Sequence, residues 1–148
     1  MSNKKPILVF DVDGTICRET DDDGNLYHPL GVSYSDRPPY PFAVKAINDL
    51  YDQGYEIVLF TARYMHKENQ SQLNSHSRGY SELVKWCEKW GINYSRLVFG
   101  KPSGQLYIDN HGFRLESEKG EKQWDGLREF LKDFKTTDYE NAKLPLSV

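Results

Sequence analysis

The chain has 148 residues, of which 28% are charged, and its formal net charge is −3. That length suits one domain with a sheet covered by helices. The balance of charge excludes the bulk basicity by which many proteins hold nucleic acids, and no apolar run is long enough to span a membrane. Two cysteines without metal-ligand spacing, and no signal-peptide pattern, lead us to expect a reduced, cytoplasmic protein.

The first element is a short buried strand, indicated by the apolar run at residues 7–10. Asp11 and Asp13 follow it directly. Side chains two residues apart in an extended segment point the same way, so both carboxylates should face a crevice at the carboxyl end of the strand. Gly14 permits a sharp turn there, and Thr15 can cap the segment that follows.

Residues 16–40 carry little helical periodicity and are interpreted as a small hairpin or flap over the crevice. Asp21-Asp22-Asp23-Gly24-Asn25 is a strong turn signal. It lacks the glutamate and the flanking helices of a calcium-binding loop. Residues 36–41 are expected to be extended, because residues before proline avoid the helical region.

Helix and strand then alternate. Helical spacing predicts a helix over residues 42–51 that is ended by Gly54, and the run at 56–60 predicts a second buried strand. This order implies a right-handed crossover between parallel strands. The polar stretch 64–79 is interpreted as a frayed helix or a long loop beside the site.

Helical spacing returns over residues 80–90. Apolar runs predict a third strand at 96–99 and a fourth at 106–108, and a last helix is expected from about 123 to 134. The polar tail over residues 136–148 is expected to be loose.

A polar group follows each predicted strand: Asp11 with Asp13, then Thr61, then Lys101, then Asp109. The carboxyl ends of parallel strands meet at one edge of a sheet, which is where open α/β sheets bind ligands. These side chains are therefore expected to share one site.

The motif Asp-x-Asp-Gly-Thr at 11–15, followed in order by Thr61, Lys101 and Asp109, resembles the haloacid dehalogenase superfamily of phosphotransferases. The resemblance covers roughly residues 6 to 115. It implies an α/β fold, a Rossmann-like three-layer sandwich with a central parallel sheet. We expect one domain over residues 1–148 with no large cap domain, because only about 25 residues separate the first motif from the next helix.

The expected chemistry is phosphoryl transfer, which depends on positioning and electrostatics. Asp11 is the candidate nucleophile, and Asp13 is the candidate to protonate the leaving oxygen and then to activate water. Thr61 would hold a phosphate oxygen, and Lys101 would neutralise charge on phosphate and nucleophile. The resemblance implies the same roles.

Crowded carboxylates favour a hard cation, and Mg²⁺ is usually held by one or two of them with water and phosphate oxygens. The expected metal ligands are Asp11, Asp13, Asp109 and Asn110. Many relatives carry a second acidic residue where this chain has Asn110. The Asp-Asn pair looks like the version in the carboxy-terminal-domain protein phosphatases of this superfamily, so we expect catalysis to be retained.

The expected function is Mg²⁺-dependent hydrolysis of a small phosphorylated metabolite, a sugar phosphate or nucleotide, through an aspartyl phosphate. The triplet at 61–63 and the short flap look most like small phosphatases associated with capsule polysaccharide biosynthesis. Arginine suits phosphate and carboxylate groups. The expected substrate-binding residues are Thr61, Ala62, Arg63, Lys101, Arg18 and Arg37.

Two alternatives stay open. Residues 36–40 look like the phosphatase half of phage polynucleotide kinase-phosphatases, so a nucleic-acid 3′-phosphatase is possible, though less favoured. Asn110 and the missing cap would also suit an inactive phosphate-binding regulatory domain. A continuous groove lined by Arg18, Arg37, His66, Lys67 and Arg78 would favour nucleic acid over a small molecule. The sequence leaves the oligomeric state open.

Overall fold

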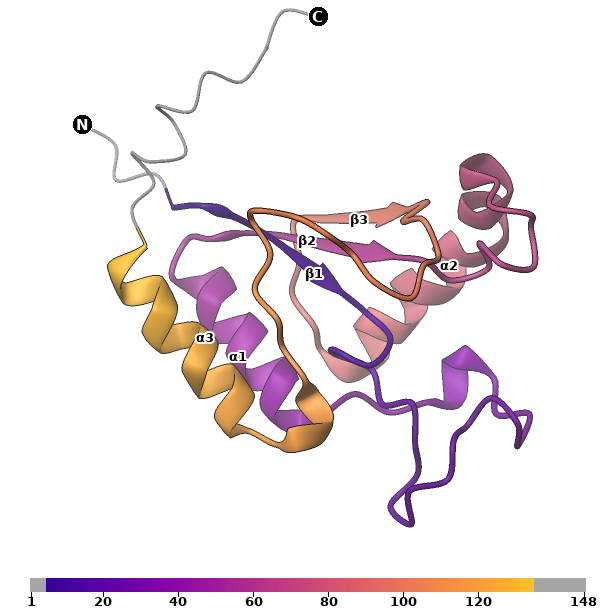
Figure 1. Cartoon of the computed structure of the whole chain (residues 1–148), viewed down its shortest axis with the longest axis horizontal. Coiled ribbons are helices and arrows are strands. Elements are labelled where there is room, and N and C mark those ends of the chain that lie inside the picture. Colours follow the sequence, from indigo (N-terminus) through magenta and orange to yellow (C-terminus); the bar gives the residue numbers. More distant parts are fainter. Residues whose placement is uncertain (1–4, 135–148) are drawn as a thin grey trace, which may run out of the picture.

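Three parallel strands form the centre of the computed structural model, which describes residues 5–134 (Figure 1). Each strand is a run of apolar, mostly β-branched or aromatic side chains, which favour extended backbone. The sheet order is β1-β2-β3, and pairing places Phe10 opposite Leu59 and Leu59 opposite Leu97. The strands are β1 (Ile7–Asp11), β2 (Glu56–Thr61) and β3 (Arg96–Phe99).

Helices connect and flank these strands, with α1 and α3 side by side and α2 farther along the sheet (Figure 1). The α-helices are α1 (Pro41–Asp52), α2 (Gln72–Trp90) and α3 (Lys122–Asp133). Two short 3-10 helices are η1 (Tyr34–Asp36) and η2 (Ser117–Lys119). None of the helices within residues 5–134 combines the length and the apolar character that crossing a membrane requires.

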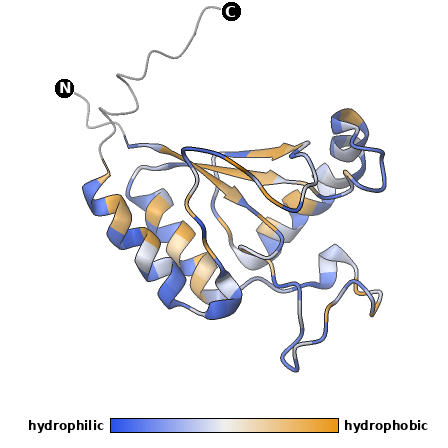
Figure 2. Ribbon diagram, viewed as in Figure 1, coloured by the Kyte–Doolittle hydropathy of each residue, from blue (hydrophilic) through white to orange (hydrophobic). Residues whose placement is uncertain are grey.

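One hydrophobic core joins all three helices to the same face of the sheet. The ribbon is coloured as hydrophobic along much of the three strands and on parts of each helix (Figure 2). Phe10 of β1 stacks on Trp124 of α3, with ring centroids 5.6 Å apart, and Ile47 of α1 and Trp86 of α2 are buried in the same core. The α/β class and the central parallel sheet flanked by helices, as predicted, are confirmed.

The opposite face of β1 is more open. Ile7 and Val9 are 46% and 59% exposed, and the segment after β3 crosses the sheet on its way to η2 (Figure 1). The predicted fourth strand at 106–108 is wrong, because these residues lie in an irregular and exposed segment. Tyr107 instead folds back locally: its hydroxyl donates to the carbonyl of Pro102 at 2.5 Å, and its ring lies under Lys101 Nζ, 4.3 Å from the centroid.

Helix α2 begins earlier than the sequence indicated. Ser71 caps it by accepting a hydrogen bond from the backbone N–H of Asn74 at 3.1 Å. Gly79 then lets the helix lie close to the sheet, since a Cβ there would come within 2.6 Å of the Phe99 ring and 2.8 Å of the Tyr64 ring. The second half of the stretch 64–79 is therefore helical.

The expected flap at 16–40 is present and lies beyond the end of the sheet (Figure 1). Its arms are joined by backbone hydrogen bonds from Arg18 N to Pro38 O at 3.0 Å and from Tyr40 N to Ile16 O at 2.9 Å. The predicted turn at 21–25 is closed by Asp21, whose Oδ1 accepts from the backbone of Asp23 and Asn25. The tail at 136–148 lies outside the described residues.

Candidate active site

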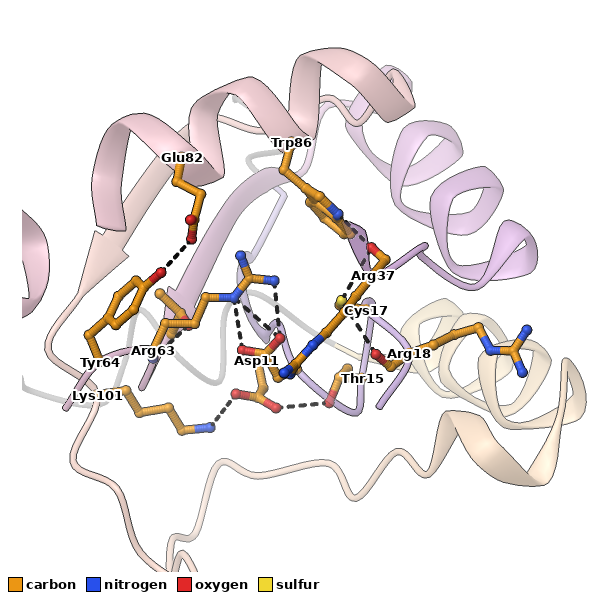
Figure 3. Close-up of polar contacts among 12 residues, drawn as sticks. Asp11, Thr15, Cys17, Arg18, Arg37, Arg63, Tyr64, Glu82, Trp86 and Lys101 are labelled. Atoms are coloured by element: carbon orange, nitrogen blue, oxygen red, sulfur yellow. Dashed lines mark hydrogen bonds and ion pairs between the residues drawn. The ribbon is translucent and has the colours of Figure 1, made fainter. Parts of the chain in front are cut away.

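Asp11 lies at the carboxyl end of β1 between two donors (Figure 3). Lys101 Nζ is 3.0 Å from its Oδ1, and the hydroxyl of Thr15 donates to its Oδ2 at 3.2 Å. Burial raises the pKa of Asp11, the charge and hydrogen bond of Lys101 oppose that rise, and the charge of Asp13 adds to it. This carboxylate is held in one orientation with both oxygens in contact with a donor.

Asp13 is held from the end of β2. Arg63 donates through Nε to both carboxylate oxygens, at 3.2 and 3.0 Å, and through Nη2 to Oδ1 at 3.0 Å. The Arg63 side chain is fully buried, and the rings of Tyr34 and Trp86 lie 4.4 and 5.6 Å from its guanidinium carbon. Burial acts to lower the pKa of Arg63, but the charge and hydrogen bonds of Asp13 outweigh it and leave that pKa raised.

A cavity of about 320 Å³ lies over these groups, within the range of roughly 300–1,000 Å³ usual for small-molecule sites. It brings together five of the residues that the sequence indicated. The lining residues are Asp11, Asp13, Glu19, Tyr34, Ala62, Arg63, Lys101, Gly104 and Tyr107.

Thr61 does not line this cavity. Its side chain is buried on the core side of the sheet, and its Oγ1 accepts a hydrogen bond from the backbone N–H of Arg63 at 3.0 Å. In this arrangement Thr61 fixes the turn that carries Arg63. Its predicted contact with a phosphate oxygen stays a prediction.

Arg18 and Arg37, the other two arginines predicted to bind substrate, do not line this cavity. Arg18 lies outside the cavity and pairs with Asp22 at 2.7 Å. Arg37 is buried within the flap, where Nε and Nη2 both donate to the carbonyl of Val32 at 3.1 and 2.9 Å. Arg37 lines a smaller neighbouring cavity instead.

Asp109 and Asn110 are exposed and do not line the main cavity. Asp109 Oδ1 accepts from the backbone N–H of His111 at 2.8 Å, so the side chain caps its own turn. Within residues 5–134 there is no group of three or more His, Cys, Asp or Glu side chains arranged to hold a metal ion. The structure therefore brings two of the four predicted metal ligands together.

The charges of the cavity nevertheless suit a divalent cation. Its lining holds three carboxylates and two cationic side chains, and each cation is already paired with one carboxylate. A phosphate group entering this site would meet net negative charge. Mg²⁺ accepts oxygen ligands from one or two carboxylates together with phosphate and water, so the donor set that Asp11 and Asp13 offer fits this ion.

Glu19 was missed by the sequence reasoning. It lies in the flap among turn-forming residues, where an acidic side chain is ordinary, and only the folded flap brings it to the cavity. Tyr34 and Tyr107 were missed for the same reason, because no pattern of spacing links either residue to the strand ends.

Comparison with known proteins supports the fold. No family model and no curated protein matches the chain. A crystal structure of a target protein from Vibrio cholerae is similar over 83% of this chain and 98% of that one, with a TM-score of 0.61 and 22% identity. That likeness shows a shared small, Rossmann-like α/β fold.

The chain is also similar to D,D-heptose 1,7-bisphosphate phosphatase from B. bronchiseptica, crystallised with magnesium and phosphate. The match covers 73% of this chain, with a TM-score of 0.43 and 17% identity. The chain spans about half (54%) of the length of that phosphatase.

Proposed function

We propose that the protein is a Mg²⁺-dependent phosphohydrolase that acts on a small phosphorylated metabolite through an aspartyl phosphate on Asp11. The observation that carries this proposal is the placement of Asp11 between Lys101 Nζ and the Thr15 hydroxyl in a cavity of about 320 Å³. A carboxylate with fixed orientation at the end of a parallel strand is suited to attack a phosphorus atom.

In the first step one oxygen of Asp11 forms a bond to phosphorus while the bond from phosphorus to the ester oxygen breaks. Lys101 lies beside that carboxylate and neutralises charge on the nucleophile and the phosphoryl group. Asp13 gives a proton to the leaving oxygen. Arg63 holds Asp13 in place by donating to both of its oxygens, which suits the carboxylate that is left after this transfer.

In the second step Asp13 takes a proton from a water molecule, and the resulting hydroxide attacks phosphorus. The bond from phosphorus to Asp11 breaks, inorganic phosphate leaves and the carboxylate is restored. Splitting hydrolysis in this way replaces one difficult step by two easier ones.

Asp11 and Asp13 would hold Mg²⁺, and Asp109 and Asn110 are the further ligands that the motif order predicts. When bound, the ion supplies positive charge that stabilises the transferring phosphoryl group. Glu19 is the carboxylate of the cavity lining that is not paired with Arg63 or Lys101, and its negative charge supports this requirement for a cation.

The placement of the basic residues favours a small substrate over nucleic acid. Arg78 pairs with Glu68 at 2.7 Å and lies over the ring of Tyr64, and Arg18 pairs with Asp22. Of the five basic residues considered for a nucleic-acid groove, only Arg37 lines either of the two cavities described. Pairing with carboxylates leaves Arg18 and Arg78 with less charge to offer to a strand of phosphates, which supports a small substrate.

The direct test is hydrolysis of an aryl phosphate by the purified protein with Mg²⁺ and with EDTA, followed by a panel of phosphorylated metabolites and 3′-phosphorylated oligonucleotides. We expect Mg²⁺-dependent turnover, with metabolites preferred over oligonucleotides. If the protein preferred oligonucleotides, nucleic acid and not a small metabolite would be its substrate. Absence of any turnover would leave the inactive phosphate-binding domain as the better description.

Asp13→Asn tests the proton transfer. We expect a much larger loss of kcat for alkyl and sugar phosphates than for aryl phosphates, because a good leaving group needs less protonation. Measuring kcat for a series of leaving groups gives the dependence on leaving-group pKa. An equal loss across the series would contradict the general-acid role.

A further inference from the structure

A second cavity of about 210 Å³ adjoins the main one. The two share Asp13, Glu19 and Tyr34, so a molecule with its phosphate over Asp11 can extend past Asp13 into the second space. The remaining walls come from the flap. They are Leu26, His28 and Arg37.

The size of this second cavity favours a small group. Its volume lies below the roughly 300–1,000 Å³ typical of sites for drug-sized ligands. Its position matters equally, because Asp13 is the residue proposed to protonate the leaving oxygen and it lies in both linings. The part of a substrate attached to that oxygen would therefore project into the flap cavity.

Glu19 supplies a free acceptor at the junction. Its carboxylate accepts no hydrogen bond within the described residues 5–134, unlike those of Asp11 and Asp13. It lies against Gly14, which has φ +84°, and a Cβ on Gly14 would come within 2.6 Å of Glu19 Oε1. Loss of surrounding water raises the pKa of Glu19, the charges of Asp13 and Asp11 raise it further, and Arg37 opposes the rise.

The walls disfavour two kinds of leaving group. The Tyr34 ring has the guanidinium carbons of Arg37 and Arg63 at 4.5 and 4.4 Å from its centroid, which leaves little free face for stacking a nucleobase. Arg37 is tied to the carbonyl of Val32 by two donors. The charge of Arg37 is balanced by that of Glu19, and Asp13 is paired with Arg63, so this lining offers no surplus positive charge to a second phosphate.

We propose that the flap cavity binds an uncharged, polyhydroxylated leaving group, with Glu19 accepting hydrogen bonds from its hydroxyls. Sugar or polyol monoesters are the substrate class that this chemistry fits, since their hydroxyls donate and their C–H faces can lie on Leu26. A hydroxyl donating to a carboxylate makes a charge-assisted bond, stronger than a neutral one. The inference rests on the proposed phosphohydrolase function.

Glu19→Gln tests this assignment against Asp23→Asn, which removes an exposed carboxylate from the same flap outside both cavities. The substrates are an aryl phosphate, a panel of hexose, pentose and polyol monophosphates, the matching bisphosphates and nucleoside monophosphates. For the best sugar monophosphate we expect Glu19→Gln to raise KM about tenfold, the loss of one charge-assisted hydrogen bond. The preference for monophosphate over bisphosphate should fall by a similar factor.

The outcomes separate this proposal from the function itself. Wild-type protein that hydrolyses aryl phosphate but prefers nucleotides or bisphosphates overturns the leaving-group assignment and leaves the phosphohydrolase intact. So does a Glu19→Gln variant whose selectivity matches that of Asp23→Asn. Wild-type protein that hydrolyses nothing overturns both. Melting temperatures of the two variants show whether either substitution disturbs the fold.

Discussion

Two segments of this molecule end in an aspartate and have opposite surroundings. β1 is paired with β2 along its length and delivers Asp11 to a cavity, where Lys101 and Thr15 contact it. Residues 106–108 precede Asp109 in an irregular segment, and these three residues are 69%, 50% and 93% exposed. Asp109 contacts its own turn instead.

The difference shows what a short apolar run needs in order to become a strand. β1 has a neighbour for its backbone hydrogen bonds, and Phe10 packs on Trp124. A strand of three residues gains few ladder bonds and buries little area, so local contacts such as those of Tyr107 can outweigh it. Within the part of the chain that the structure describes, β1 pairs with β2 alone and its other edge has no partner strand.

The largest expected effect is that of Asp11→Asn. An amide does not attack phosphorus, so we expect kcat to fall more than about a thousandfold, as when other enzymes lose their nucleophile. Turnover of an aryl phosphate measures this, with Asp52→Asn, at the exposed end of α1, as the matched control. In a crystal of the wild type soaked with beryllofluoride, the fluoride complex should be bound to Asp11.

The stability of Asp11→Asn is expected to stay equal or rise at pH 7. Because the pKa of Asp11 is raised in the folded state, the folded state disfavours the charged carboxylate at pH values above its ordinary pKa. The neutral amide relieves that cost, and the difference from wild type should vanish below the ordinary pKa. Full activity in Asp11→Asn, in a preparation free of other phosphatases, would contradict the mechanism.

Lys101→Met should lower kcat by about a hundredfold, the order of loss seen when one transition-state donor is removed. It should also move the acidic limb of the pH profile of kcat/KM to higher pH. Lys101 lowers the pKa of Asp11, so without it the carboxylate stays protonated to a higher pH. Lys85→Met on the exposed side of α2 is the control. An unshifted acidic limb would show that Asp11 ionisation does not set it.

Asp109→Asn tests whether the second segment takes part in the site. If Asp109 is a metal ligand, the concentration of Mg²⁺ for half-maximal activity should rise about tenfold, the lower end of what lost metal-site partners cost. The melting temperature should not change, because the side chain is exposed. Unchanged Mg²⁺ dependence would restrict the metal ligands to the residues that line the cavity.

The contrast also explains which features the sequence could predict. Strands β1, β2 and β3, and helices α1 and α3, lie where periodicity placed them, because each buries a regular apolar face. The first turns of α2 were harder to predict, since they are polar and contain Gly79. That glycine is required by the close approach of Phe99, a contact between segments distant in sequence.

The residues of the site also fall into those that the sequence could predict and those that it could not. Asp11, Asp13 and Lys101 were predictable because each directly follows a strand, and parallel topology brings strand ends together. Glu19 was not predictable, because its place depends on how the flap folds over Gly14. Arg63 was predicted to bind substrate, but its contact with Asp13 requires the actual separation of β1 and β2.

The smallest expected effect concerns Ser117, which follows the irregular segment in the chain and contacts the loop after β1. Ser117 of η2 is buried, donates its hydroxyl hydrogen to the carbonyl of Thr15 and accepts from the indole N–H of Trp124 at 2.9 Å. Ser117→Ala leaves both groups without this partner, which should cost about 1–3 kcal/mol in the free energy of unfolding. Chemical denaturation measures the cost, with the exposed Ser103→Ala as the control. Because Thr15 also holds Asp11, kcat should fall a few-fold while KM changes little, and a variant as stable and active as wild type would show that the loop at 11–15 is held without Ser117.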